Sequence, residues 1–189
     1  MGMIRRAKQE DKEFIWQVHT EAISELCKNH YTQQQIQAWT SFLIPESYRE
    51  VIETREFFVV EDDKSIVGFG QLNFETGEVE AVYVSPKSVE HGLGRRILQT
   101  LENVAREKGL KSLHLSSSLN AVPFIKKQVT HRTMSLSIIT QWDGVSLYLY
   151  GKTPQLAAAQ HCVGADGIEA ILSVRVRGYL PPHNFIVRT

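Results

Sequence analysis

The segment from residue 78 to residue 116 constrains the fold more than any other part of the sequence. Residues 78–84 (EVEAVYV) alternate and are rich in β-branched side chains, which predicts a strand. Apolar side chains then recur at helical spacing over residues 97–105, and residues 112–116 predict another strand. A strand, a helix and a strand in this order predict a crossover unit within a mixed α/β sheet.

The rest of the chain extends this pattern on both sides. Strands are expected at about residues 3–7, 57–60, 65–74, 134–140 and 145–150, and helices at about residues 11–27, from Thr32, from Pro45 and at residues 120–128. Thr32 and Gln35 have the spacing of a capping box. Phe14 is expected on the apolar face of the first helix. Asp143-Gly144 predicts a hairpin turn between the last two strands.

Composition and charge exclude several classes of protein. The 189 residues include 42% hydrophobic and 22% charged residues, which is typical of a globular protein rather than a disordered or fibrous one. Twenty-one basic residues balance twenty-one acidic ones, so we expect neither nucleic acid nor a membrane as a partner. Cys27 and Cys162 are too few for a disulfide framework and too isolated for a metal site. With no secretory signal, the expected location is cytoplasmic.

The start of the helix after residue 91 has the features of an anion site. Gly92 and Gly94 let the backbone curl closely around a ligand, and the first turn of a helix has unpaired N–H groups. Arg95 and Arg96 add positive charge there, where the helix dipole disfavours it. This pattern indicates phosphate or pyrophosphate binding. The spacing lacks the Lys-Ser/Thr of a Walker A loop, and Ile97 replaces the third glycine of a dinucleotide fingerprint.

These residues lie within a longer resemblance. The segments that carry it are Val82-Tyr83-Val84-Ser85-Pro86, His91-Gly92-Leu93-Gly94-Arg95-Arg96-Ile97-Leu98, Ile4-Arg5-Arg6-Ala7 with Asp11, His30-Tyr31-Thr32 with Gln35 and Ala38-Trp39, Val67-Gly68-Phe69-Gly70, and Ser118-Leu119-Asn120-Ala121-Val122-Pro123-Phe124. Together they resemble the GNAT superfamily, the acyl-CoA-dependent N-acyltransferases. The resemblance is good over residues 3–128 and rests only on the strand pattern over residues 129–153.

The resemblance implies an α/β fold whose mixed, mostly antiparallel central sheet has helices on both faces and a splayed strand pair. The strand at Val82–Val84 and the strand at residues 112–116 form that pair, and the acyl thioester lies between them. The expected domains are residues 1–153, the acetyltransferase domain, and residues 154–189, an appendage of a different composition.

The resemblance also implies acetyl-CoA as cosubstrate, with no metal. The residues it assigns to cofactor binding are Val82, Tyr83 and Val84 by the strand edge, His91, Gly92, Leu93, Gly94, Arg95 and Arg96 by their backbone amides, and Asn120 and Phe124 along the pantetheine arm. Within this set, the Tyr83 side chain is expected in the core. Asn120 can alternatively cap the helix that follows it.

The resemblance places the catalytic base, which accepts the proton of the attacking amine, at Glu80. Glu80 can alternatively be only a solvated strand residue. Tyr31 and Trp39 are expected to line the pocket of that amine, or else to pack the second helix. Relatives place a tyrosine that protonates the leaving thiolate after the phenylalanine matched by Phe124; this chain has Ile125 there. It also has Val129-Thr130 where relatives have glycine and an aromatic residue.

Three functions follow from these residues. The first is N-acetyl transfer from acetyl-CoA to a small-molecule or peptide amine by direct attack on the thioester. The second is a non-catalytic module that binds or senses acyl-CoA and has lost its general acid. The third is a homodimeric structural or interaction protein that exchanges residues 154–189 between copies.

Overall fold

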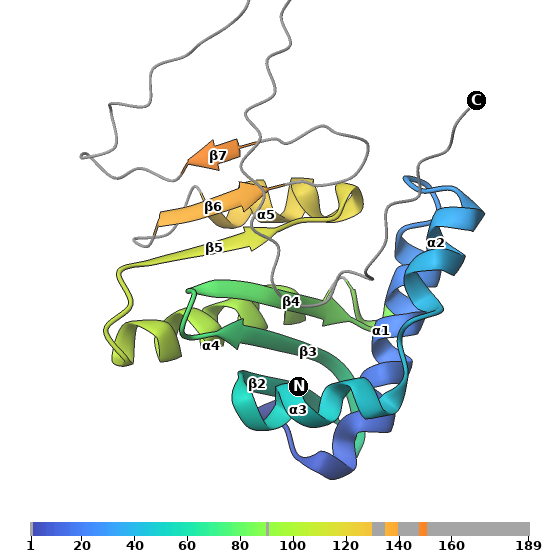
Figure 1. Ribbon diagram of the computed structural model, residues 1–189, viewed down its shortest axis with the longest axis horizontal. Coiled ribbons are helices and arrows are strands. Elements are labelled where there is room, and N and C mark those ends of the chain that lie inside the picture. The colour runs from blue at the N-terminus through green and yellow to red at the C-terminus, as the bar shows by residue number, and fades with distance from the viewer. Residues whose placement is uncertain (1, 90, 130–134, 140–147, 151–189) are drawn as a thin grey trace, which may run out of the picture.

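The computed structural model describes residues 2–89, 91–129, 135–139 and 148–150, and its strands form one sheet in chain order (Figure 1). The strands are β1 (Met3–Arg6), β2 (Glu56–Asp62), β3 (Ser65–Asn73), β4 (Glu78–Val84), β5 (Ser112–Ser116), β6 (Ser135–Ile139) and β7 (Tyr148–Tyr150). Strands β1 to β4 pair antiparallel, as do β6 and β7. Only the β4–β5 and β5–β6 pairings are parallel in the described sheet. The mostly antiparallel mixed sheet is therefore confirmed.

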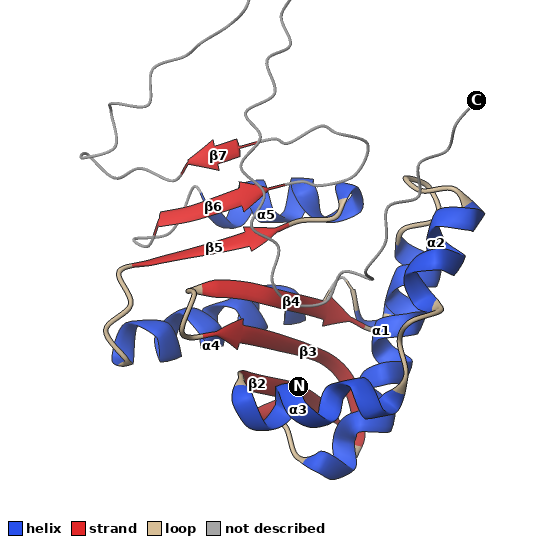
Figure 2. Ribbon diagram, in the orientation of Figure 1, coloured by secondary structure: helices blue, strands red, loops and turns tan. Residues whose placement is uncertain are grey.

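Helices lie on both faces of this sheet (Figure 2). They are α1 (Lys12–Leu26), α2 (Gln33–Thr40), α3 (Tyr48–Thr54), α4 (Leu93–Glu107) and α5 (Val122–Val129), with short 3-10 turns η1 (Gln9–Asp11), η2 (Pro45–Ser47), η3 (Pro86–Ser88) and η4 (Leu119–Ala121). The predicted capping box starts α2: Gln35 N donates to Thr32 Oγ1 and Thr32 N donates to Gln35 Oε1. The Asp143-Gly144 hairpin, Cys162 and the appendage lie outside the described residues.

Two apolar clusters hold the helices to the sheet. On one face, Ile97, Leu98 and Leu101 of α4 are fully buried against strand residues that include Leu72 and Val79. On the other face, side chains of α1 and α3 pack on Phe57, Val59 and Phe69. Alternate strand residues thus face opposite clusters, as strand geometry requires.

One residue of the first helix differs from the prediction. Phe14 is 54% exposed, whereas the expected face of α1 buried it. Ile15 and Val18 point into the core. Phe14 directly precedes Ile15 and therefore lies about 100° away from it around the helix, outside the buried face. Among the described residues, the helices are too short or too polar to span a bilayer.

Strands β4 and β5 separate soon after they meet. Their only paired residues are Glu78 with His114 and Val79 with Leu115. Beyond Val79, residues Ala81 to Val84 of β4 pair with β3 alone, and Glu80 has no register partner on either side. The splayed strand pair expected from the resemblance is therefore present, and it opens toward the end of β4 that leads to α4.

Candidate active site

Glu80 is the first residue of β4 beyond the last pair with β5. The register on the other side of β4 shifts at the same place, because Gln71 pairs with Ala81 but Leu72 pairs with Val79. Glu80 is consequently the extra residue of a β-bulge, an irregularity that redirects a side chain. It points to the face covered by α1 and α3, where its partners lie.

Three donors bind the Glu80 carboxylate. Arg55 Nε donates to Oε2 at 3.1 Å, the Gln71 side-chain amide donates to the same oxygen, and Asn73 Nδ2 donates to Oε1 at 3.2 Å. The Glu80 side chain is 17% exposed. The residue expected to be the base is therefore an ordered, partly buried carboxylate rather than a solvated strand residue.

A second carboxylate lies beside it. Glu78 Oε2 is 3.9 Å from Nε2 of His114, the β5 residue that pairs with Glu78 just before the strands separate. Burial raises the pKa of the Glu78 carboxyl group, and the charge of Glu80 raises it further, while His114 and Arg55 act in the opposite direction. Leu113 and Leu115 of β5 are buried against α4, so His114 lies on the opposite face with both carboxylates.

The amino end of α4 presents its backbone amides as the sequence predicts. Gly92 caps the helix with φ +69°, and open space surrounds the position of its missing Cβ. The first intrahelical bond runs from Arg96 N to Gly92 O at 3.1 Å. The N–H groups of Leu93, Gly94 and Arg95 precede that bond and therefore have no acceptor within the helix. His91 and Gly92 are exposed, so solvent reaches this turn.

Arg96 differs from its expected role. Its backbone N–H is already used inside the helix, and its guanidinium Nη2 donates to the carbonyl of Gly2 at 2.7 Å. The side chain therefore ties α4 to the start of the chain. Arg95 is exposed, so its charge lies in solvent close to the expected anion site. Leu93 is 6% exposed and contributes its side chain to the α4 cluster.

Phe124 of α5 contacts the first turn of α4. A Cβ on Gly94 would lie 3.3 Å from the Phe124 ring, so a side chain here requires the ring to move slightly. Ile125, the next residue, is 4% exposed within the α4 cluster. Position 125 thus faces the core in this chain, and its side chain has no proton to give.

The two strand valines and Tyr83 lie along the unpaired edge of β4. Val82 and Val84 pack partly against the α4 cluster. The Tyr83 ring stacks on Phe69 at 5.4 Å and lies 4.0 Å from the His19 ring, centroid to centroid. Tyr83 is a core side chain, as expected, so only its backbone borders the gap.

Asn120 and Tyr31 connect the two sides of that gap. The Cys27 thiol donates to Asn120 Oδ1 at 3.3 Å, and Leu119 N donates to the Tyr31 hydroxyl at 2.8 Å. Asn120 lies within η4, two residues before the first residue of α5, so it is not the residue at the amino end of that helix. The Trp39 ring meets the Tyr31 ring edge-on at 5.7 Å. Trp39 therefore supports Tyr31.

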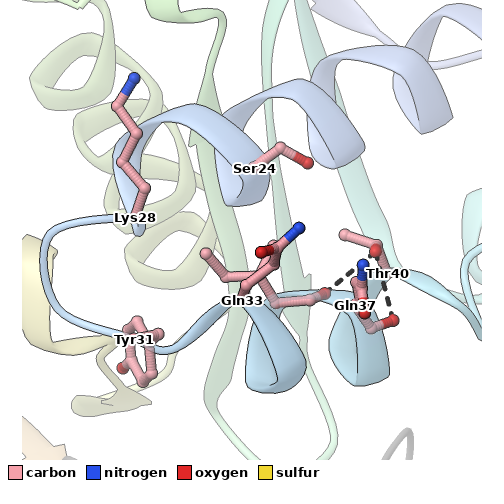
Figure 3. Close-up of a pocket in the computed structure, with 7 residues that line it drawn as sticks. Ser24, Lys28, Tyr31, Gln33, Gln37 and Thr40 are labelled. Atoms are coloured by element: carbon pink, nitrogen blue, oxygen red, sulfur yellow. Dashed lines mark hydrogen bonds between the residues drawn. The ribbon is translucent and has the colours of Figure 1, made fainter.

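A groove of about 430 Å³ runs between α1 and α2 (Figure 3). It is lined by Ser24, Lys28, Tyr31, Gln33, Ile36, Gln37 and Thr40. Lys28 Nζ binds Glu25 at 2.8 Å, and in Figure 3 its side chain extends away from Gln33. The polar groups that face the groove are mostly amides and hydroxyls, with Tyr31 at the end nearer to η4.

The comparison with known families decides what this arrangement is. A family model described as the acetyltransferase (GNAT) domain matches residues 27–128, which include β4, the α4 amino end and η4. The chain belongs to the GNAT acetyltransferase family. Its members are acyltransferases, and acetyl transfer that depends on acetyl-CoA is the reaction class that the family supports.

Solved structures show the GNAT fold. The PaiA N-acetyltransferase from Thermoplasma acidophilum, in complex with coenzyme A, is 20% identical with a TM-score of 0.67, covering 81% of this chain and 99% of that one. A GCN5-related N-acetyltransferase from Rhodopseudomonas palustris is 20% identical with a TM-score of 0.65, covering 79% and 92%. The ribosomal-protein-alanine N-acetyltransferase from Brucella melitensis is 21% identical with a TM-score of 0.53, covering 78% and 96%.

The GNAT sequence pattern misses several residues that the structure brings to the site. The Glu80 carboxylate is bound by Arg55, Gln71 and Asn73. Beside it lies the pair of Glu78 and His114. Alternation within residues 78–84 puts Glu78 on the same face as Glu80, so the sequence pattern alone could have predicted that Glu78 lies near the site. Arg55 was not, because its place depends on how α3 packs on the sheet.

Proposed function

We propose that this GNAT protein transfers an acetyl group from acetyl-CoA to the nitrogen of a primary amine. The observation that supports it most is the separation of β4 from β5 after Val79 and Leu115, directly beside a carboxylate held in a β-bulge. A gap between strands admits a slender arm, and a carboxylate beside it suits proton removal. We keep the cytoplasm as the expected compartment.

The residues of this chain fit coenzyme A. The free N–H groups at Leu93, Gly94 and Arg95 suit the pyrophosphate, with Gly92 leaving room for it. The β4 edge at Val82–Val84 offers backbone groups to the pantetheine arm, as a strand edge does to an added strand. Asn120 and Phe124 flank the same gap. When bound, acetyl-CoA supplies an activated acetyl thioester.

Glu80 acts as the base in this proposal. A primary amine is largely an ammonium ion at neutral pH and attacks only after it loses a proton. The carboxylate lies on the face of α1 and α3, opposite the α4 face, so the amine approaches from that side. We place the more distant part of the acceptor in the groove between α1 and α2, beside Tyr31, with Trp39 behind it.

A second candidate function is a non-catalytic acyl-CoA sensor. Ile125 favours it, because a core isoleucine cannot protonate the leaving thiolate. Transfer nevertheless stays our conclusion, since water can protonate a thiolate, whereas a sensor has no need of an ordered carboxylate in the gap. The structural homodimer rests on residues 154–189, outside the described part of the chain.

Calorimetry with acetyl-CoA, followed by thiol release with primary amines, tests the proposal. We expect binding together with amine-dependent release of coenzyme A. Binding without release on any amine supports the sensor instead. Absence of binding at millimolar acetyl-CoA contradicts both functions and leaves the homodimer, which the solution mass of the full chain and of a chain ending at Thr153 can test.

A further inference from the structure

Arg55 is placed against Glu80 by the end of α3. Its backbone N–H donates to Val51 O at 3.0 Å, which closes the helix, and its side chain then extends to β4. The Arg55 side chain is 25% exposed, so most of the ion pair with Glu80 is shielded from water. An ion pair shielded in this way has a more defined geometry than a surface pair.

The donors are unequally divided between the two oxygens of Glu80. Oε2 accepts from Arg55 and Gln71, whereas Oε1 accepts from Asn73. The Asn73 side chain is itself fixed, because its Oδ1 accepts the backbone N–H groups of Glu75 and Thr76 at 3.1 and 3.3 Å. A carboxylate oxygen accepts about two hydrogen bonds. Oε1 therefore keeps one accepting position, while Oε2 is saturated.

We propose that Arg55 is a positioning residue of the transfer reaction, which fixes Glu80 so that Oε1 receives the proton of the acceptor amine. The inference rests on the proposed function. In the step it serves, a C–N bond forms to the acetyl carbon as the C–S bond breaks. The sulfur keeps the electron pair. The ammonium ion gives its first proton to Glu80 Oε1 before the attack, and the nitrogen's second proton passes through water to the departing thiolate.

The location separates this role from that of a structural ion pair. Glu80 is both the bulged residue and the first residue after the β4–β5 pairing ends, so its orientation matters where the gap opens. The charged and titratable groups around the two neighbouring carboxylates are His114 of β5, which lies beside Glu78, and Arg55, which follows α3 and contacts Glu80. Arg55 is the strong cation of that group, and it contacts the carboxylate directly.

The test compares Arg55→Met and Arg55→Lys with Arg49→Met, a matched change at an exposed arginine of α3. Thiol release is measured at saturating acetyl-CoA with ethanolamine, spermidine, glucosamine and alaninamide, and the best acceptor is used throughout. We expect Arg55→Met to lower kcat about 100-fold, the effect of a misplaced reacting group, with the KM for acetyl-CoA unchanged. Arg55→Lys and Arg49→Met should retain most of the activity.

Chemical rescue distinguishes positioning from stability. Arg55→Ala should regain at least a tenth of wild-type kcat in millimolar guanidinium, far below denaturing concentrations, while Arg49→Ala should not respond. A wild-type kcat in Arg55→Met, or a loss that neither lysine nor guanidinium reverses, overturns the proposal. If the wild-type protein transfers acetyl to none of the four amines, the proposed function fails first, and the inference about Arg55 fails with it.

Discussion

The Tyr31 hydroxyl accepts the backbone N–H of Leu119 at 2.8 Å, although the two residues are 88 positions apart in the chain. Tyr31 follows α1, which packs on β3 and β4, and Leu119 follows β5. The bond therefore joins the two halves of the sheet at the end where β4 and β5 have separated. Cys27 and Asn120 make a second link at the same place.

Tyr31→Phe should weaken this connection. The change removes the acceptor of a partly buried N–H, so we expect the free energy of unfolding to fall by about 1 to 2 kcal/mol. Hydrogen exchange should show lost protection at the Leu119 amide. Cys27→Ser is the matched comparison, because it alters the second link and should leave the Leu119 amide protected. Unchanged exchange at Leu119 in Tyr31→Phe would contradict the link.

His19 should make stability depend on pH. Its Nδ1 lies 2.7 Å from the Tyr48 hydroxyl, its Nε2 is buried without a partner among the described residues, and burial lowers its pKa from 6.5 to about 3. Between these two values the unfolded chain binds the proton that the folded chain excludes. Stability is therefore complete above pH 6.5 and falls as the pH decreases toward 3.

Urea unfolding at pH 7 and pH 5 measures this dependence. We expect the His19 contribution to lower the free energy of unfolding by roughly 2 kcal/mol between these pH values. His19→Gln should be less stable at pH 7 but should lack that part of the decrease. His30→Gln, at an exposed position, should behave as the wild type. The same decrease in His19→Gln and in the wild type would show that other groups cause it.

Local patterns predicted most of the fold. The strand at Glu78–Val84 and the strand at Ser112–Ser116 have the bounds expected from their alternation, and Thr32 caps α2 as its spacing indicates. Such features depend on neighbours in the chain, and sequence periodicity reports them directly. The splayed pair came from the family resemblance, since nothing within β4 or β5 alone encodes where their pairing stops.

The site was less predictable than the fold. Glu80 was found from its place on β4, but its partner Arg55 is 25 residues away in the chain, and no local pattern connects them. Arg96 was assigned to the anion site from its position in the first turn, yet its guanidinium reaches Gly2. Side-chain directions of this kind are set by tertiary packing, which one sequence does not display.

A large side chain at position 94 should weaken acetyl-CoA binding. A Cβ at this position would lie 3.3 Å from the Phe124 ring, and a larger side chain would displace that ring into the gap beside the α4 amides. We expect Gly94→Ala to weaken acetyl-CoA binding slightly and Gly94→Leu to weaken it by about tenfold or more, which corresponds to about 1.4 kcal/mol in calorimetry.

Gly109 at the other end of α4 provides the control. It has φ +87° and open space around its missing Cβ, so Gly109→Ala should cost about 1 kcal/mol of stability through backbone strain alone. Acetyl-CoA affinity should stay at the wild-type value. If Gly94→Leu and Gly109→Ala change affinity equally, the effect comes from helix stability, and the anion site lies elsewhere.

The two carboxylates beside the gap should differ in their effect on acetyl transfer. Glu80→Gln preserves shape but removes the proton acceptor, so we expect kcat to fall by about 100-fold to 1,000-fold with little change in acetyl-CoA affinity. Glu78→Gln should have a smaller effect on the rate. Because the raised pKa of Glu78 reflects burial and the charge of Glu80, Glu80→Gln should also lower the pKa of Glu78.

Glu75→Gln is the matched control, because this exposed residue lies in the turn just before β4. Its kcat should equal that of the wild type. Thiol release gives the three rates, and carboxyl carbon resonances recorded against pH give the titration of Glu78. A larger loss of kcat in Glu78→Gln than in Glu80→Gln would move the base to the carboxylate beside His114. The hydrogen bonds of Glu80 would then serve only to stabilise the β-bulge. The amine would lose its proton to Glu78, where β4 and β5 are still paired.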